Sequence, residues 1–289
     1  MSDYMTLVIW NTCNQSCQHC MIEGSIKNDP PMGFARYKVA IDQLVAVKKH
    51  TKLILSGAEV TLCSELLEYI YYASGKKYFT EIQLQTNALK LVDTVFMQAI
   101  VAAGVTEFFI SVPGIRTAKM LTRNPEQGEM IFSIIESIKK NTAAKVITNT
   151  VVTTINLGEI KETMKRLISL KVDGLMIWNY WPMAETDKLN LLVSLKDWHI
   201  VQQEINTLLL GTSIPLYLRG FPICLLPHDT RYVQDDCFPD TLASEKLWGK
   251  VRLNKYTCTD KQRCRLKNCE GVAVAYTNKF GRCVFVPYT

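Results

Sequence analysis

The sequence TLVIWNTCNQSCQHC, residues 6–20, joins a short apolar run to three closely spaced cysteines. The run at Thr6–Asn11 is rich in β-branched and aromatic residues, which predicts a buried strand. Cys13, Cys17 and Cys20 follow with the spacing C-x3-C-x2-C, so one loop at the end of this strand carries three thiols. Three thiolates this close can hold three irons of a [4Fe–4S] cubane and leave the fourth iron open to a small molecule.

A structural zinc site is the alternative interpretation of this loop, with His19 or His50 as a fourth ligand. Zinc sites usually present cysteine pairs spaced C-x2-C, whereas this loop begins with a C-x3-C step. The spacing therefore favours the iron–sulfur cluster.

Downstream, β-rich apolar runs alternate with longer amphipathic segments, which predicts six βα units. The expected strands are Thr6–Asn11, Lys52–Leu55, Glu81–Leu84, Thr106–Val112, Lys145–Val152 and Gly174–Tyr180. The expected helices are Tyr37–Lys49, Ser64–Ser74, Leu89–Ala102, Glu126–Lys140, Leu157–Leu170 and Asp197–Leu209. This alternation predicts an α/β fold with a parallel sheet, and six units suit an open, partial TIM-like (β/α)6 barrel.

Local signals mark some of the boundaries. Asn156 stands where a helix N-cap is expected, with Glu159 three residues on to complete a capping box, and Gly104 stands where a helix ends. After about residue 210 the alternation is interrupted by Pro215, Pro222, Pro227 and Pro239, and cysteines become frequent. We therefore expect a barrel domain at residues 1–210 and a small cysteine-rich domain at residues 211–289.

Composition limits the class of protein. The chain has 289 residues, 48% hydrophobic and 21% charged, which suffices for a substantial core. No apolar stretch approaches the roughly 20 residues that span a bilayer, and the N-terminus lacks the basic start of a secretory signal. We therefore expect a cytoplasmic protein without membrane contact. Thiols stay reduced in that compartment, so ten cysteines indicate metal ligation or redox chemistry.

Charge is unevenly distributed along the chain. Residues 245–289 hold ten Lys and Arg against three Asp and Glu, a balance of +7, so the net charge of +6 leaves about −1 for the remainder. Three interpretations stay open: a solvated basic surface, an acidic partner, and compensation for a buried anionic metal–thiolate site.

The cysteine loop, with Asn14 after its first cysteine, resembles the signature of the radical S-adenosylmethionine (radical SAM) superfamily. Ser56-Gly57-Ala58-Glu59 resembles the family's Gly-Gly-Glu-Pro segment, although Ala58 replaces the second Gly and Val60 the Pro. Further segments resemble the family pattern at later strand ends: Gln85–Ala88, Ser111–Gly114, Leu121–Arg123 and Asn149–Val152 with Asn156. The resemblance covers essentially the whole chain.

The resemblance implies a cofactor site along the ends of the strands. Ser56, Gly57, Ala58 and Glu59 would line the methionine amino group, with Asn87 in the next strand-end turn. Ser111, Arg123 and Asn149 would contact the carboxylate and ribose, and the ring of His19 would pack against the adenine. Met183, in an aromatic run after the sixth strand, is a further candidate.

The C-terminal cysteines resemble the auxiliary-cluster region of the SPASM and twitch groups of radical SAM enzymes. The resemblance implies one auxiliary [4Fe–4S] cluster on Cys224, Cys258, Cys264 and Cys269, and a zinc site on the same thiols is the alternative. Cys237 and Cys283 are left over. One could replace a ligand or donate a hydrogen atom to a substrate radical, or both are ordinary thiols.

The family chemistry implies reductive cleavage of S-adenosylmethionine to a 5′-deoxyadenosyl radical, with a reductant such as flavodoxin or ferredoxin. Relatives with such a C-terminal region form cross-links, thioethers or epimers in peptides, so we expect a peptide or protein substrate. A small-molecule metabolite is the alternative. A non-enzymatic iron–sulfur or zinc protein that binds nucleic acid through the basic segment is the alternative of another class. It leaves the strand-end motifs unexplained, so nucleic acid is not an expected partner.

Overall fold

A computed structural model describes residues 3–22, 29–182, 184–222, 232–234, 239–244, 256–258 and 271–281. Within them, nine strands form one sheet in the order β8-β7-β6-β5-β4-β3-β2-β1-β9, and every neighbouring pair is parallel. The strands are β1 (Tyr4–Trp10), β2 (Lys52–Gly57), β3 (Glu81–Thr86), β4 (Glu107–Ser111), β5 (Lys145–Val152), β6 (Gly174–Asn179), β7 (Leu216–Arg219), β8 (Tyr232–Gln234) and β9 (Asp240–Leu242).

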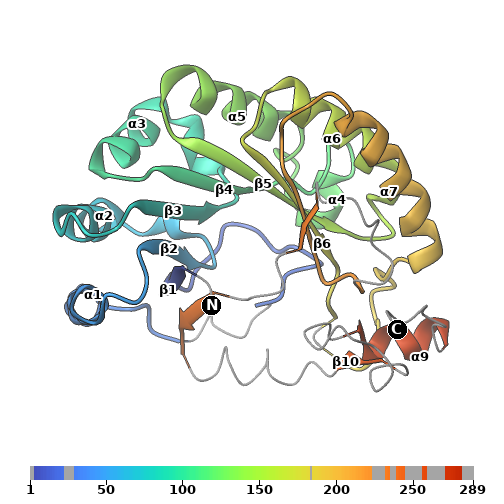
Figure 1. Cartoon of the computed structure of the whole chain (residues 1–289), viewed down its shortest axis with the longest axis horizontal. Helices are drawn as coiled ribbons and strands as arrows, with labels where there is room; N and C mark the ends of the chain where they lie inside the picture. Colours follow the sequence, from blue (N-terminus) through green and yellow to red (C-terminus); the bar gives the residue numbers. More distant parts are fainter. Residues whose placement is uncertain are drawn as a thin grey trace.

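Helices cover the outer face of this curved sheet (Figure 1). They are α1 (Phe34–Val47), α2 (Leu66–Gly75), α3 (Thr94–Ala103), α5 (Glu129–Asn141), α6 (Ile160–Ser169) and α7 (Leu195–Leu209). The short helix α4 (Ala118–Thr122) lies inside this ring of helices (Figure 1) and contacts the loop that follows β1. Three short 3-10 turns lie between the helices: η1 (Val60–Leu62), η2 (Leu89–Val92) and η3 (Leu157–Glu159). Near the C-terminus, β10 (Tyr256–Thr257) and β11 (Val272–Ala273) form an antiparallel pair that leads into α9 (Val274–Phe280).

Alternation along each strand separates the two faces of the sheet. In β3, Ile82 and Leu84 are buried in the core between sheet and helices, so Gln83 and Gln85 face the concave side. The hydroxyl of Ser56 in β2 donates to Gln85 Oε1 at 2.7 Å, and Gln85 Nε2 donates to Gln83 Oε1 at 3.2 Å. The concave side is therefore partly polar, whereas the side that meets the helices is apolar.

The two outer strands of the sheet come from consecutive parts of the chain. β8 pairs with β7 at one edge, and β9 pairs with β1 at the other. Gln234 and Asp240 are only six residues apart, a stretch that spans at most about 22 Å. Neighbouring strands lie about 4.8 Å apart, so this bound limits how far the two edges can separate, and the sheet is curved but open, a partial barrel.

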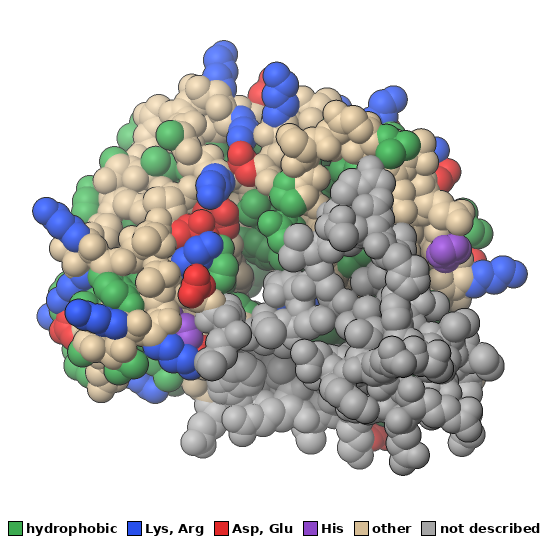
Figure 2. Space-filling model, in the orientation of Figure 1, with side chains coloured by type: hydrophobic (Ala, Val, Ile, Leu, Met, Phe, Trp, Pro, Cys, Tyr) green, Lys and Arg blue, Asp and Glu red, His purple; other side chains and the backbone are tan. Residues whose placement is uncertain are grey.

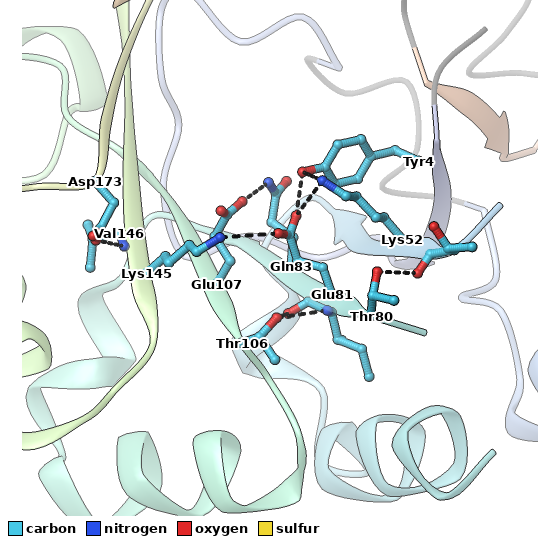
Figure 3. A network of polar contacts seen from close by, with 12 residues as sticks. Tyr4, Lys52, Thr80, Glu81, Gln83, Thr106, Glu107, Lys145, Val146 and Asp173 are labelled. Atoms are coloured by element: carbon cyan, nitrogen blue, oxygen red, sulfur yellow. Dashed lines mark hydrogen bonds and ion pairs between the residues drawn. The ribbon is translucent and has the colours of Figure 1, made fainter. Parts of the chain in front are cut away.

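A polar network ties together the starts of β1 to β5 (Figure 3). The hydroxyl of Tyr4 donates to Glu81, whose carboxylate also lies 3.9 Å from Lys52 Nζ and 3.7 Å from Lys145 Nζ. Gln83 donates to Glu107, and burial raises the pKa of that carboxyl. Figure 2 shows acidic and basic side chains gathered near the middle of the face it draws, beside an apolar area. The network occupies the edge where strands begin, which in barrels of this kind serves stability more than chemistry.

The predicted α/β partial barrel is confirmed, and each of the six expected strands overlaps an observed one. Gly104 ends α3 as expected, with φ of 126°. The predicted capping box is wrong, because Asn156 makes no capping hydrogen bond and Glu159 binds a different loop. Three strands that follow residue 211 join the main sheet, and the division into two domains stays a prediction. Among the described residues no helix is long and apolar enough to cross a membrane.

Candidate active site

The cysteine loop lies at the edge of the sheet where the parallel strands end, directly after β1. Cys13, Cys17 and Cys20 are each half-buried, and Cys20 N donates to Cys17 O at 3.3 Å. Burial, with Cys20 and Cys13 nearby, raises the pKa of Cys17 to about 12. The three sulfurs are therefore close enough to disfavour one another as thiolates, a cost that a bound cation would offset.

The sulfurs do not converge on one point. Among the described residues, no three His, Cys, Asp or Glu side chains are arranged to hold a single metal ion. His50, a candidate zinc ligand, precedes β2 at the opposite edge of the sheet, where its Nε2 lies 3.0 Å from Asp240. A tetrahedral zinc ion needs converging ligands, whereas the cysteines of a cubane each bind a different iron around its outside. Three thiols on one short loop are the ligand set of a cubane with one open iron, so the residues present fit that cluster.

One side of the loop is held by the end of β2. Ala58 N donates to Trp10 O at 2.8 Å, and Glu59 N donates to Thr12 O at 3.0 Å. A Cβ at Gly57 would lie 2.1 Å from Trp10 O, so only glycine permits this approach. The segment that resembles Gly-Gly-Glu-Pro therefore lies directly against the chain that leads into the cysteines.

The side chain of Glu59 fixes this arrangement from inside. It is 1% exposed and accepts hydrogen bonds from Thr61 N (3.1 Å), Thr61 Oγ1 (2.6 Å), Thr86 Oγ1 (2.6 Å) and Asn87 N (2.6 Å). Burial raises the pKa of Glu59, and these donors oppose the shift without cancelling it. Asn87 in turn donates through Nδ2 to Asn14 Oδ1 at 2.7 Å, which connects the end of β3 to the loop.

The other side of the loop is held by α4. Gln18 N donates to Leu121 O at 2.8 Å, Gln18 Nε2 donates to Met120 O at 2.8 Å, and Ser16 N donates to Thr122 O at 3.4 Å. Both donor residues flank Cys17. The sequence pattern gives no sign of α4, because five residues are too few to show helical periodicity.

A second buried glutamate lies at the start of α4. Glu159 is 3% exposed and accepts from Ile115 N (3.2 Å), Arg116 N (2.6 Å), Thr117 N (3.0 Å) and Thr117 Oγ1 (2.5 Å). The guanidinium of Arg116 also lies 3.3 Å from its carboxylate. Burial alone would raise the pKa of Glu159, but these hydrogen bonds outweigh it and leave the pKa lowered.

The candidate ribose and carboxylate contacts lie around β4 and β5. Ser111 is exposed at the end of β4 and stands beside Asn149 in the register of the sheet. Asn149 is 8% exposed, and its buried Oδ1 has no hydrogen-bond partner among the described residues. Arg123 is exposed and follows α4 with φ of 54°. Asn156 donates to Pro113 O at 2.8 Å and so supports the turn after β4.

The remaining candidates divide between described and undescribed residues. Burial lowers the pKa of His19 to about 4, so its ring is neutral at neutral pH, and its buried Nδ1 has no partner within the described part of the chain. Met183 lies outside the described residues, as do Cys224, Cys237, Cys264, Cys269 and Cys283.

Of the C-terminal candidates, Cys258 is described. It is half-buried and packs against a small apolar cluster made of Tyr180, Leu191, Leu192, Val272, Ala275 and Tyr276. Leu195 N donates to the hydroxyl of Tyr276 at 2.8 Å, and Lys279 of α9 lies 2.7 Å from the buried carboxylate of Asp187. The C-terminal helix is thereby fixed to the segment between β6 and α7. The sequence pattern does not single out Asp187, because its partners are 92 and 4–5 residues away.

On the concave side, aromatic and cationic groups of β4, β6 and β7 lie together. The rings of Phe109 and Trp178 have centroids 6.4 Å apart, and the guanidinium of Arg219 lies 5.1 Å from the Trp178 centroid. Arg219 is 6% exposed. This half of the interior is therefore suited to planar and apolar groups, whereas the half near β2 and β3 offers amides.

Known proteins are similar to this chain in family and in fold. A family model described as the Radical SAM superfamily matches residues 7–167. The fold is similar to Streptococcus suis SuiB bound to S-adenosylmethionine, with 13% identity, a TM-score of 0.64, and coverage of 96% of this chain and 74% of that one. For SuiB bound to precursor peptide SuiA, identity is 13%, TM-score 0.67 and coverage 96% and 73%.

A structure of native anSMEcpe with bound AdoMet is also similar, with 16% identity, a TM-score of 0.59, and coverage of 74% of this chain and 63% of that one. In a further SuiB structure, this chain spans 54% of the length of its counterpart. At such identities the likeness concerns the fold alone. No curated protein sequence matches this chain significantly.

Proposed function

Because this chain belongs to the radical SAM superfamily and is an enzyme that uses S-adenosylmethionine, we propose that it abstracts a hydrogen atom from a peptide or protein substrate. The carrying observation is the cysteine loop after β1. Its three sulfurs lie close together without converging on one ion, and it is held between the ends of β2, β3 and α4. Membership in this family is at odds with the non-enzymatic, nucleic-acid-binding alternative.

In this proposal, Cys13, Cys17 and Cys20 hold a [4Fe–4S] cluster. When bound there, such a cluster would supply the electron for reductive cleavage of S-adenosylmethionine and hence the radical chemistry that removes hydrogen from the substrate. The backbone of residues 56–59 lines the methionine amino group at the end of β2. The buried Oδ1 of Asn149 accepts from a ribose hydroxyl, which supplies the partner it lacks among the described residues. Ser111 and Arg123 contact the carboxylate and ribose, and the neutral ring of His19 packs against the adenine.

A peptide substrate is supported by two observations. The fold resembles SuiB, which has been captured with a precursor peptide, and anSMEcpe, which has been captured with a Kp18Cys peptide. The concave side also carries the half-buried Gln85, whose amide keeps donor and acceptor capacity beyond its bonds to Ser56 and Gln83 and matches the groups of a peptide backbone. The products would be a cross-link, a thioether or an epimer. A small-molecule metabolite remains the alternative substrate.

The proposal includes an auxiliary [4Fe–4S] cluster of the SPASM/twitch kind on Cys224, Cys258, Cys264 and Cys269, within a domain at residues 211–289. Its support is the position of Cys258, which packs where α9 is fixed to the segment after β6. The alternatives are zinc on the same thiols, and a role for Cys237 or Cys283 as ligand or hydrogen donor. A cytoplasmic flavodoxin or ferredoxin would be the reductant.

The test is anaerobic reconstitution followed by reduction with dithionite and addition of S-adenosylmethionine. Wild type should release 5′-deoxyadenosine, and Cys17→Ala should not. Cys63→Ala, which removes a buried thiol of the core, is the matched control and should keep the activity. An iron content of about eight per chain supports two cubanes, and about four reduces the C-terminal site to zinc or nothing. Wild type that holds iron but never forms 5′-deoxyadenosine, alone or with cell extract, would refute the proposal.

For the substrate, short peptides encoded beside the gene are the first candidates. Turnover with such a peptide should produce modified peptide and 5′-deoxyadenosine in equal amounts; a cross-link or thioether is read as a loss of mass, and an epimer as deuterium uptake when the reaction runs in D2O. Turnover with a small metabolite, and none with any peptide, would decide for the alternative.

A further inference from the structure

We infer that Glu159 and Gln18 are positioning residues that hold Cys17 in place through α4. We call Gln18, residues 115–122 and Glu159 together the strut. The inference rests on the proposed cluster at Cys13, Cys17 and Cys20. Glu159 contacts the start of α4, whereas the cysteine loop contacts its end. The inference therefore gives Glu159 a function in cofactor binding that is transmitted through the helix.

The cysteine loop contacts the end of α4. The last carbonyls of a helix lack intrahelical partners, so those of Met120, Leu121 and Thr122 are free to accept other donors. Gln18 fills two of them with its backbone and side-chain amides, both at 2.8 Å. Because Ser16 and Gln18 flank Cys17, the direction of the Cys17 side chain follows the position of α4.

Glu159 fixes the start of α4. Glu159 gathers three consecutive backbone N–H groups and one hydroxyl, from residues 115–117. A Cβ at Gly114 would lie 2.4 Å from Thr117 Oγ1 and 2.8 Å from Glu159 Oε2, so the chain is tightly folded around this carboxylate. The side chain of Met120 is 54% exposed, so the apolar contacts of α4 come from its other face. Glu159 thus holds the start of this helix through hydrogen bonds from three consecutive backbone N–H groups and the Thr117 hydroxyl.

The two sides of the cysteine loop are held by different elements. Trp10 and Thr12 are bonded to the end of β2, and Asn14 is bonded to Asn87. These contacts precede or adjoin Cys13. The bonds to α4 are made by the residues on either side of Cys17. Loss of the strut should therefore alter the Cys17 corner of the cluster and leave the Cys13 corner in place.

The test compares wild type, Gln18→Ala, Glu159→Gln and Glu162→Gln after reconstitution. Glu162 is the matched control, because it pairs with the same Arg116 at 2.7 Å and touches no backbone N–H of the strut. We expect the rate of iron loss to a chelator to rise roughly five-fold in Gln18→Ala and ten-fold or more in Glu159→Gln. The electron paramagnetic resonance spectrum of the reduced cluster, and its change on adding S-adenosylmethionine, should shift in both variants and not in Glu162→Gln.

A double variant, Gln18→Ala with Glu159→Gln, tests whether the two residues act together. Its rate of iron loss should fall short of the product of the single effects, because both changes weaken the same contact between the loop and α4. Multiplying effects, or spectra identical to wild type in Glu159→Gln, would overturn the inference. A wild type that binds no iron would instead overturn the proposed cluster, so the two failures are distinguishable.

Discussion

Glu59 and Glu159 both expose almost no surface and accept hydrogen bonds from similar groups, yet their pKa values shift in opposite directions. The donors to Glu59 are uncharged, and desolvation by burial outweighs them and raises its pKa. Glu159 gains three backbone N–H groups and the guanidinium of Arg116, whose side chain is 66% exposed, and its carboxylate is favoured. Glu59 lies deep in the interior, where desolvation outweighs its donors, whereas Glu159 lies just beneath the surface beside Arg116, where three backbone N–H groups and a hydroxyl suffice to stabilise the carboxylate.

The largest effect is expected for Glu59→Ala. Four donors would lose their acceptor at a site that is almost fully buried, and we expect the free energy of unfolding to fall by about 4 kcal/mol. Urea unfolding measures it, with Glu65→Ala on the exposed start of α2 as the control. A loss smaller than that of Glu159→Ala would break the comparison.

A glycine in each region gives the next effect. A Cβ at Gly57 would meet the backbone oxygen of Trp10 at 2.1 Å, whereas a Cβ at Gly114 would meet the ends of two side chains. Backbone yields less readily, so Gly57→Ala should cost about 3 kcal/mol and Gly114→Ala less. Gly33→Ala, with no atom within 4 Å of the added Cβ, is the control for both. Equal losses in urea unfolding would show that the two loops are equally tight.

Glu159→Ala should reduce the free energy of unfolding by about 2 kcal/mol. The value is below that of Glu59→Ala because Glu159 lies close enough to the surface for water to reach the freed N–H groups, as the exposure of Arg116 shows. Glu162→Gln should leave the midpoint of unfolding unchanged. If Glu159→Ala matched Glu59→Ala, the surface argument would be wrong.

The smallest effect is a difference in pH dependence. Glu159 has a lowered folded pKa, so its stabilisation is complete above its ordinary pKa of 4.5 and is lost as the pH falls through the folded value. Glu59 has a raised folded pKa, so its contribution is complete below 4.5 and is lost as the pH rises through the folded value. The free energy of unfolding should be measured across this pH range for wild type, Glu59→Gln and Glu159→Gln. As the pH rises, the difference between wild type and Glu159→Gln should grow, and the difference between wild type and Glu59→Gln should shrink. Parallel curves would contradict the assignment.

Much of the framework is predictable from the sequence, because the strands are rich in β-branched and aromatic residues and alternate with longer amphipathic helices. Lys145–Val152 is predicted to its exact bounds. The cysteine loop, Gly57 and Asn87 are recognisable from local motifs. Glu159 is not, since its position in a capping pattern hides a contact with residues more than forty positions away. β7, β8 and β9 are short, and their pairing depends on partners distant in the sequence, so periodicity does not reveal them.

The pairing of β9 with β1 has a consequence for how the chain is made. Met5 and Asp240 are partners although 235 residues separate them, and Lys49 and Ser244 add polar contacts to Asp240 and Asp29 at the same edge. At a synthesis rate of 5–20 residues per second, roughly ten to fifty seconds pass before β9 exists. Throughout that time β1 has an open edge, a template for unwanted pairing with other chains. The nascent enzyme is therefore most exposed to aggregation at the strand that leads into its cysteines.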